Sequence, residues 1–196
     1  MPRTVDGEQR RQDVVAAVWR VILRDGLDRA SVRNVASEAG LSMGSLRHYF
    51  ATQSELLAFT LRAIIERIQQ RIAALPPEPD ERRRAEMVLA ELLPMDAERA
   101  VENRVWLAFT ARAMVDPKLG ALQSEGYALL REGCRTVVRS LEVPASAGDR
   151  EADRLHALVD GLAVHAATHP EVATPARMRE VIAAHLAELC RPPEDV

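Results

Sequence analysis

The chain has 196 residues, of which 47% are hydrophobic, 28% are charged and 4% are aromatic, and its formal net charge is -3 at pH 7. These proportions exclude a disordered chain, and the low aromatic content favours an all-α fold over a β fold. No apolar run approaches the ~20 residues of a membrane span, and the N-terminus lacks the apolar core of a signal peptide, so we expect a cytoplasmic protein with no membrane partner.

Charge is distributed unevenly along the chain. Residues 1–75 hold 11 Arg and 8 acidic residues, a net charge of +3, whereas the remaining 121 residues hold 15 basic and 21 acidic residues, a net charge of -6. A basic N-terminal part joined to an acidic remainder is typical of a protein that meets DNA with one end. Random scatter of surface charge is the alternative interpretation.

The first predicted helix covers about residues 8–25 and ends at Gly26. Its apolar residues recur at helical spacing on one face, at Val14, Val15, Val18, Val21 and Ile22. We expect this face to pack behind the two short helices that follow. The three helices together would form an N-terminal domain.

Residues 31–50 predict two short helices joined by a tight turn. Ser31 can cap the first helix and Ser42 the second, because each side-chain oxygen can accept from the free amides of the following turn. Gly40 suits the left-handed conformation that closes a helix. The pattern is a helix-turn-helix, and an ordinary surface hairpin is the alternative.

The outward face of the second short helix carries groups that can bond to DNA. Arg47 can form two parallel hydrogen bonds with a guanine edge or a phosphate, and Ser45 and Tyr49 can donate to phosphate oxygens. Gly44 removes a side chain where the backbone must approach closely. The predicted DNA-binding residues are Arg33, Ser42, Met43, Gly44, Ser45, Arg47, His48, Tyr49 and Gln53.

Taken in order, these segments resemble the DNA-binding domain of the TetR family of transcriptional repressors over roughly residues 10–60. The resemblance is carried by the apolar residues of the first helix, Gly26, the segments 31–36, 39–42 and 46–50, and Glu55-Leu56-Leu57. Such proteins often carry a phosphate-binding lysine where this chain has Gln53. A neutral amide can bond to a phosphate but releases no counterion, so we expect a weaker contact that is less sensitive to salt.

The rest of the chain predicts six more helices, about nine in all. Thr52 and Glu55 form a capping box at the start of a helix that reaches about Leu75, roughly 34 Å long, before the prolines of residues 76–79. The others are expected over about residues 80–93, 96–115, 116–141, 149–168 and 175–190, with a loop at 143–148. We predict an all-α protein with a helix-turn-helix domain at 1–52 and a helical effector-binding and dimerisation domain at 53–196.

The last two predicted helices carry long apolar stripes. Their residues are Leu155, Leu158, Val159, Leu162 and Ala166 on one helix, and Met178, Ile182, His185, Leu186 and Leu189 on the other. Paired across a two-fold axis, two such helices make a four-helix interface, and the resemblance implies that the dimer forms here. By composition alone the stripes could equally be internal core.

Three other predicted helices carry apolar residues with a few polar groups, which is typical of a small-molecule effector site. The residues are Leu92, Met95, Trp106, Phe109, Thr110, Met114, Tyr127, Leu130 and Cys134, and ordinary core is the alternative for each of them. The segments 106–109, 116–117 and 160–162 resemble the betaine and choline repressor branch of the family. That branch implies a cationic ligand held by aromatic faces, although only three aromatic residues lie beyond residue 75.

No catalytic, cofactor-binding or metal-binding pattern is present, so we expect no enzyme activity, no cofactor and no metal. His165 and His169 are four residues apart, but the second lies at a helix end before Pro170. Cys134 and Cys190 are far apart, and we interpret both as buried small apolar residues.

The sequence predicts a homodimeric repressor that binds a palindromic operator with recognition helices about 34 Å apart, and that is released by a small-molecule effector. Two alternatives remain. One is a dimeric DNA-binding protein without an effector. The other is a helical scaffold that binds other proteins.

Overall fold

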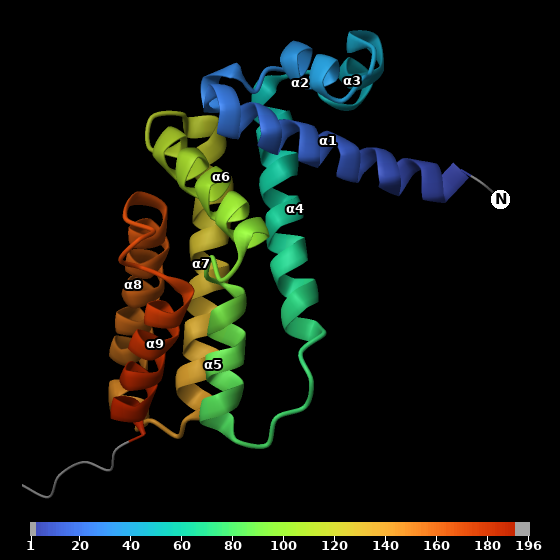
Figure 1. Cartoon of the computed structure of the whole chain (residues 1–196). Coiled ribbons are helices and arrows are strands. Elements are labelled where there is room, and N and C mark those ends of the chain that lie inside the picture. Colours follow the sequence, from blue (N-terminus) through green and yellow to red (C-terminus); the bar gives the residue numbers. More distant parts are fainter. Residues whose placement is uncertain (1–2, 191–196) are drawn as a thin grey trace, which may run out of the picture. The chain divides into compact units, whose positions relative to one another are not determined.

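Nine α-helices and one short 3-10 helix make up residues 3–190, the part of the chain that the computed structural model describes (Figure 1). No strand occurs in that part, so the predicted all-α fold is confirmed. None of its helices is both long enough and apolar enough to cross a membrane.

The helices form two compact units. The first comprises the chain up to Arg67 together with Arg104–Gln123, and the second comprises Ile68–Asn103 together with the chain from Ser124 onward. The boundaries fall inside α4 (Gln53–Ala73), α6 (Ala97–Ala113) and α7 (Pro117–Ser140), so each of these helices contributes residues to both units. The domain boundary that the sequence predicts at residue 52 lies within the first unit.

The first unit begins with α1 (Arg3–Asp25), η1 (Leu27–Arg29), α2 (Val32–Glu38) and α3 (Met43–Tyr49). The start of α1 is five residues earlier than the sequence predicts. α1 packs against η1 and α2, and α2 packs against α3. The apolar side chains of this unit that are no more than 1% exposed include Val18, Val21, Val35, Leu46 and Leu56. They come from α2 and α3, which form the helix-turn-helix, and from α1 and α4, which flank it in the sequence.

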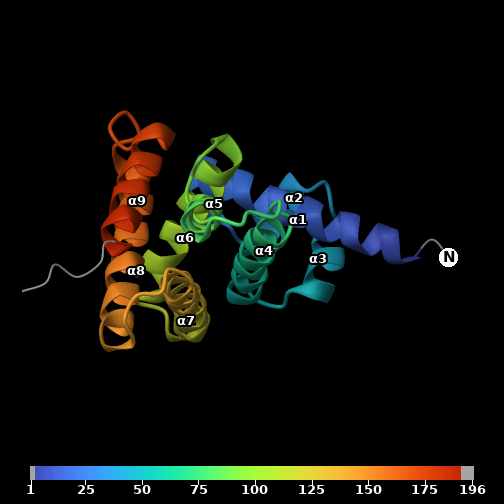
Figure 2. The ribbon, with the colours of Figure 1, turned by 90° about the horizontal axis from the view of Figure 1, so that it is seen from below.

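The second unit contains α5 (Glu81–Glu91), α8 (Ala145–Thr168) and α9 (Pro175–Leu189). α8 and α9 run side by side in both views, and α5 packs against α9 (Figure 1, Figure 2). The apolar core of this unit draws on α5, α7, α8 and α9, and its least exposed members include Leu89, Cys134, Leu155, Met178, Ile182 and Leu186.

The predicted loop at 143–148 is wrong, because α8 already begins at Ala145. Pro144 is the N-cap residue, and its carbonyl accepts hydrogen bonds from the backbone amides of Ala147 and Gly148. A proline at this position offers no side-chain oxygen as a capping signal, so the sequence pattern does not mark the helix start. The small residues that follow it are compatible with a helix.

A network of four charged residues joins α4, α5 and α6 within the second unit. Arg71 lies 3.0 Å from carboxylate oxygens of both Glu91 and Glu102, and Arg99 lies 3.2 Å from Glu91. Glu102 is only 3% exposed. Burial alone would lower the pKa of Arg71, but the hydrogen bonds and charges of Glu102 and Glu91 outweigh it and raise that pKa. The network neutralises a carboxylate that the fold has taken out of water.

The two cysteines differ. Cys134 is fully buried as predicted, and burial raises the pKa of its thiol to about 12. Cys190 is exposed, so its predicted burial is wrong. It follows the last residue of α9 as the C-cap, where the helical face that packs inward has ended.

Candidate nucleic-acid interface

The turn between α2 and α3 is closed at both ends by local hydrogen bonds. The hydroxyl oxygen of Ser31 accepts from the amide of Asn34 at 3.2 Å, and that of Ser42 accepts from the amide of Ser45 at 3.0 Å. Gly40 has a φ of +67°, and the amides of Gly40 and Leu41 donate to the carbonyls of Ser37 and Ala36. This is the left-handed helix closure that the sequence predicts.

The predicted recognition helix α3 turns one apolar residue inward and its polar face outward. Leu46 is 1% exposed, whereas Met43 and Tyr49 are 44% and 59% exposed. Arg47 is exposed as well, and Ser42 and Gly44 are exposed at the N-terminal end of the helix. Ser45 is half-buried. The side chain of His48 is not among those that the structure describes.

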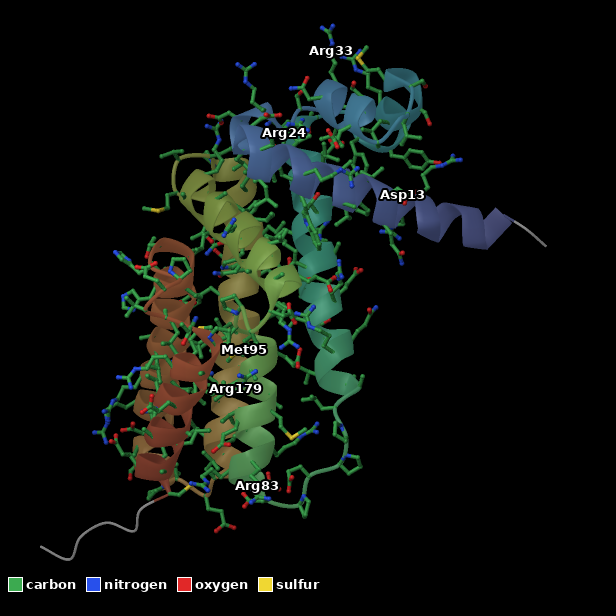
Figure 3. The ribbon with its side chains drawn as sticks, in the orientation of Figure 1. Asp13, Arg24, Arg33, Arg83, Met95 and Arg179 are labelled. Atoms are coloured by element: carbon green, nitrogen blue, oxygen red, sulfur yellow. The ribbon has the colours of Figure 1, made fainter. Side chains whose placement is uncertain are left out.

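Arg33 contributes a further exposed guanidinium, and its side chain points outward from α2 (Figure 3). The first unit therefore brings together the residues predicted on α2 and α3. An arginine, a tyrosine hydroxyl, serine hydroxyls and backbone at a glycine are the groups that commonly bond to phosphates and base edges.

Gln53, the last of the predicted DNA-binding residues, has a partner inside the protein. Its side-chain amide donates to the backbone carbonyl of Leu27 at 3.2 Å. The side chain is half-buried and links the first residue of α4 to η1. The predicted phosphate contact of Gln53 is not tested by this geometry, and it stays a prediction.

Two arginines of α1 hold α2 in place, and sequence reasoning missed them. Arg20 lies 2.7 Å from Glu38 and Arg24 lies 2.9 Å from it. Hydrogen bonds from Arg20 and Arg24 lower the pKa of Glu38, and hydrogen bonds to Asp25 and Glu38 raise the pKa of Arg24. The partners are 14 and 18 residues apart in the sequence, beyond the reach of a helical spacing rule.

The start of α4 anchors the end of α3. The amide of Glu55 donates to the hydroxyl oxygen of Thr52 at 3.2 Å, and the carboxylate of Glu55 accepts from the amide of Ala51 at 2.8 Å. The predicted capping box is thus confirmed, although its return bond reaches the residue before the cap. The rings of Phe50 and Phe59 lie 4.9 Å apart and connect the two helices further.

The predicted effector residues divide between the two units. In the first unit, Phe109 is buried, Trp106 is half-buried and Met114 is 82% exposed. The hydroxyl of Thr110, in the same unit, donates to the side-chain carbonyl of Gln123 at 3.2 Å. In the second, Met95 and Cys134 belong to the apolar core, with Leu92 and Leu130 packed against it. The assignment of these residues to an effector site stays a prediction.

Tyr127 completes that predicted set, and it lies beside a histidine and an aspartate of α8. Its ring is 53% exposed and its centroid is 4.7 Å from that of His156. The Nε2 atom of the buried His156 is 3.3 Å from the carboxylate of Asp160. Burial raises the pKa of Asp160, and the nearby His156 opposes this effect. The second unit thus places an aromatic face and a carboxylate around one histidine.

Most of the residues predicted to form the dimer interface are buried within the second unit. Six of them are no more than 8% exposed: Leu155, Val159, Leu162, Met178, Ile182 and Leu186. The other four, Leu158, Ala166, His185 and Leu189, are half-buried. Within this unit the two stripes face the core that α5 and α7 complete.

Comparison with known proteins identifies two matching families. Residues 14–60 match the family described as "Bacterial regulatory proteins, tetR family". Residues 77–191 match "BetI-type transcriptional repressor, C-terminal". The two matches follow one another along the chain and leave the end of α4 between them.

Individual relatives match over nearly the whole chain. The regulator PksA of Bacillus subtilis (strain 168) is 39% identical over 97% of this chain and 94% of its own length. The regulator BetI of Vibrio vulnificus (strain YJ016) is 31% identical over 87% of each chain. A crystal structure of a transcriptional regulator from Rhodococcus sp. Rha1 has a TM-score of 0.82 and 29% identity, and covers 93% of this chain and 99% of that one. Each of these three relatives is a regulator of transcription and not an enzyme.

Proposed function

The chain belongs to the TetR family of DNA-binding transcriptional regulators, and on that premise we propose that it is a homodimeric repressor of a palindromic operator that a small molecule releases. The observation that carries the proposal is the exposed face of α3. Arg47 and Tyr49 project from a helix that the Ser42 cap and the buried Leu46 fix in place. In the proposed complex two such helices enter successive major grooves about 34 Å apart.

The dimer is proposed to form through the outward faces of α8 and α9. Their inward faces are buried within the chain, and the outward faces carry small or short residues at helical spacing, Ala157, Gly161 and Val164 on α8 and Ala184 and Ala187 on α9. Small side chains allow helices of two subunits to approach closely in a four-helix bundle. A two-fold axis there would set the separation of the two α3 helices.

The effector is proposed to be a small organic cation. Tyr127 offers a half-exposed aromatic ring, and Asp160 offers a carboxylate on the neighbouring helix. An aromatic face and a negative charge together suit a quaternary ammonium group. Residues 77–191 match BetI-type repressors, and the resemblance to the betaine and choline repressor branch implies a ligand of this class.

The test is a gel-shift assay with DNA from the region upstream of the protein's own gene, followed by footprinting. We expect one protected palindrome at nanomolar protein, and loss of the shift with choline at millimolar concentration. Binding without release by any small cation would favour a regulator with no cationic effector. The absence of any protected sequence would contradict the operator proposal itself.

A further inference from the structure

A cavity lies between α5 and α9, and of the residues discussed above only Met95 and Ile182 line it. It has a volume of about 370 Å³. It is lined by Glu78, Arg83, Glu86, Met87, Ala90, Met95, Arg179 and Ile182, all of which belong to the second unit. The volume is within the range of small-molecule sites, about 300–1,000 Å³.

Most of the wall of the cavity comes from α5 and α9. Arg83, Met87 and Ala90 recur at helical spacing along one face of α5, and seven residues of helix span about 10 Å. Arg83 lies near the beginning of α5, Met95 beyond its end, and Arg179 on α9 beside them (Figure 3). A ligand in this site would lie along the helices as a short chain.

The floor is apolar and adaptable. Met95 and Ile182 are buried, at 8% and 1% exposed, and Met87 and Ala90 are half-buried. Methionine side chains are flexible and polarizable, and they fit apolar chains of different shape. The floor therefore suits methylene groups better than a polar solute.

The four charged residues that line the cavity differ in whether they have a partner within the protein. The carboxylate of Glu78 accepts from the amide of Asp80 at 2.9 Å, and Glu86 faces Arg82 at 4.0 Å. Arg83 is 4.0 Å from Asp80, so Arg83 and Glu86 are both only loosely paired. Arg179 forms no ion pair or hydrogen bond with any residue that the structure describes. The group at the rim without a partner is thus a guanidinium, which favours an anion.

We propose that this cavity binds an amphipathic anion, a carboxylate on a short apolar chain, with the carboxylate held by Arg179 and the chain lying on Met87 and Met95. A guanidinium matches a carboxylate with two parallel hydrogen bonds. The site contains none of the predicted DNA-binding residues and neither Tyr127 nor Asp160, although it includes Met95 of the predicted effector set, and the proposal does not depend on the operator or the cationic effector.

Methyl NMR of the full chain labelled at methionine tests the proposal with sodium octanoate as the probe. Octanoate should shift the Met87 and Met95 methyl signals saturably, while Met43 and Met114 serve as internal references. Arg179→Ala should weaken this binding at least about tenfold, because it removes a charge-assisted pair. Arg177→Ala is the matched control on the same helix, since Arg177 already pairs with Glu180 at 2.7 Å, and it should leave the affinity unchanged.

Octyltrimethylammonium is the charge-reversed probe, and we expect it to bind at least about tenfold more weakly than octanoate. Unshifted Met87 and Met95 signals would overturn the proposal. So would an Arg179→Ala variant that keeps its dispersed spectrum and binds octanoate as the parent does. Equal binding of the two probes would show an apolar site without anion selection and would overturn the assigned role of Arg179.

Discussion

The side-chain amide of Gln53, at the first turn of α4, donates to the backbone carbonyl of Leu27 in η1 at 3.2 Å. The bond joins two segments that flank the helix-turn-helix, and it is made by the same amide group for which a phosphate contact is predicted. Position 53 therefore has a structural task in this chain. The amide and a lysine at this position would act differently on stability and on DNA.

Replacing Gln53 separates these two roles. Gln53→Ala removes one hydrogen bond, and we expect the free energy of unfolding to fall by about 1 kcal/mol in urea titrations. The salt dependence of operator binding should stay unchanged. Gln53→Lys should steepen the slope of log K against log salt by about one unit, because a cation releases a counterion. If Gln53→Ala weakened DNA binding at unchanged stability, the amide would act on the phosphate instead.

The recognition helix gives the second prediction. Arg47→Ala should weaken operator binding by about 1–3 kcal/mol and relax the preference at one base pair, if its guanidinium contacts a guanine. Tyr49→Phe should weaken binding by about 1 kcal/mol through the lost hydroxyl. Arg62→Ala on the exposed side of α4 is the charge-matched control. Titrations by fluorescence anisotropy measure all three, and unchanged affinity in both α3 variants would remove this site assignment.

The sequence predicts best the features, such as helix caps, that depend only on residues within one helical turn. The caps at Ser31 and Ser42 and the closure at Gly40 depend on residues three or four positions away, and the structure confirms each of them. The start of α8 depends on the carbonyl of Pro144, for which no residue type is a signal. Local structure that needs a particular residue type, a capping hydroxyl or a glycine, is therefore visible in a sequence, whereas a helix start that needs only a backbone carbonyl is not.

Long-range partners could not be predicted from spacing. Glu38 meets arginines 14 and 18 residues away, and Gln53 meets a carbonyl 26 residues away. The stripes of α8 and α9 show a further limit, because apolar periodicity marks a face that will be buried but not what buries it. Leu155 and Ile182 prove to be covered by the chain's own core.

The ion pairs of Glu38 predict a pH dependence of stability. Hydrogen bonds from Arg20 and Arg24 hold the pKa of Glu38 below its ordinary 4.5. Between the lowered pKa and the ordinary one, the unfolded chain therefore binds a proton that the folded chain does not. The ionised carboxylate of Glu38 contributes its full stabilisation of the fold above the ordinary pKa, and this stabilisation is lost as the pH falls through the lowered pKa. Glu38→Gln should lower the melting temperature at about pH 7, and the difference from the parent should shrink toward about pH 3.

Glu66→Gln is the control for that experiment, because Glu66 is exposed and forms no ion pair with any described residue. Its melting temperature should follow that of the parent at every pH. A Glu38→Gln deficit that persisted in full at low pH would show that the carboxylate charge is not its source.

The network around Arg71 predicts a large loss on removal of one partner. Arg71→Ala takes the guanidinium away from the buried carboxylate of Glu102, and we expect the free energy of unfolding to fall by about 2–3 kcal/mol, below the ~3–5 kcal/mol of a fully buried pair because Arg71 is partly exposed. The double variant Arg71→Met, Glu102→Gln removes both charges and should recover most of the loss. Urea unfolding measures both variants, and equal losses in them would mean that packing rather than charge dominates.

Gly161 tests the proposed dimer face. No heavy atom beyond its immediate neighbours lies within 4 Å of a Cβ built at this position, so Gly161→Arg can be accommodated within the chain. In the proposed four-helix interface the same side chain would insert a charge between closely packed helices. We expect light scattering to show monomers and operator affinity to fall at least about tenfold, since both half-sites must be held together.

Gly133→Arg on α7, where the space is equally open, should leave the dimer and its DNA binding intact. Because arginine has a higher helix propensity than glycine, neither variant should lose helicity by circular dichroism, so a stable Gly161→Arg dimer would place the interface elsewhere.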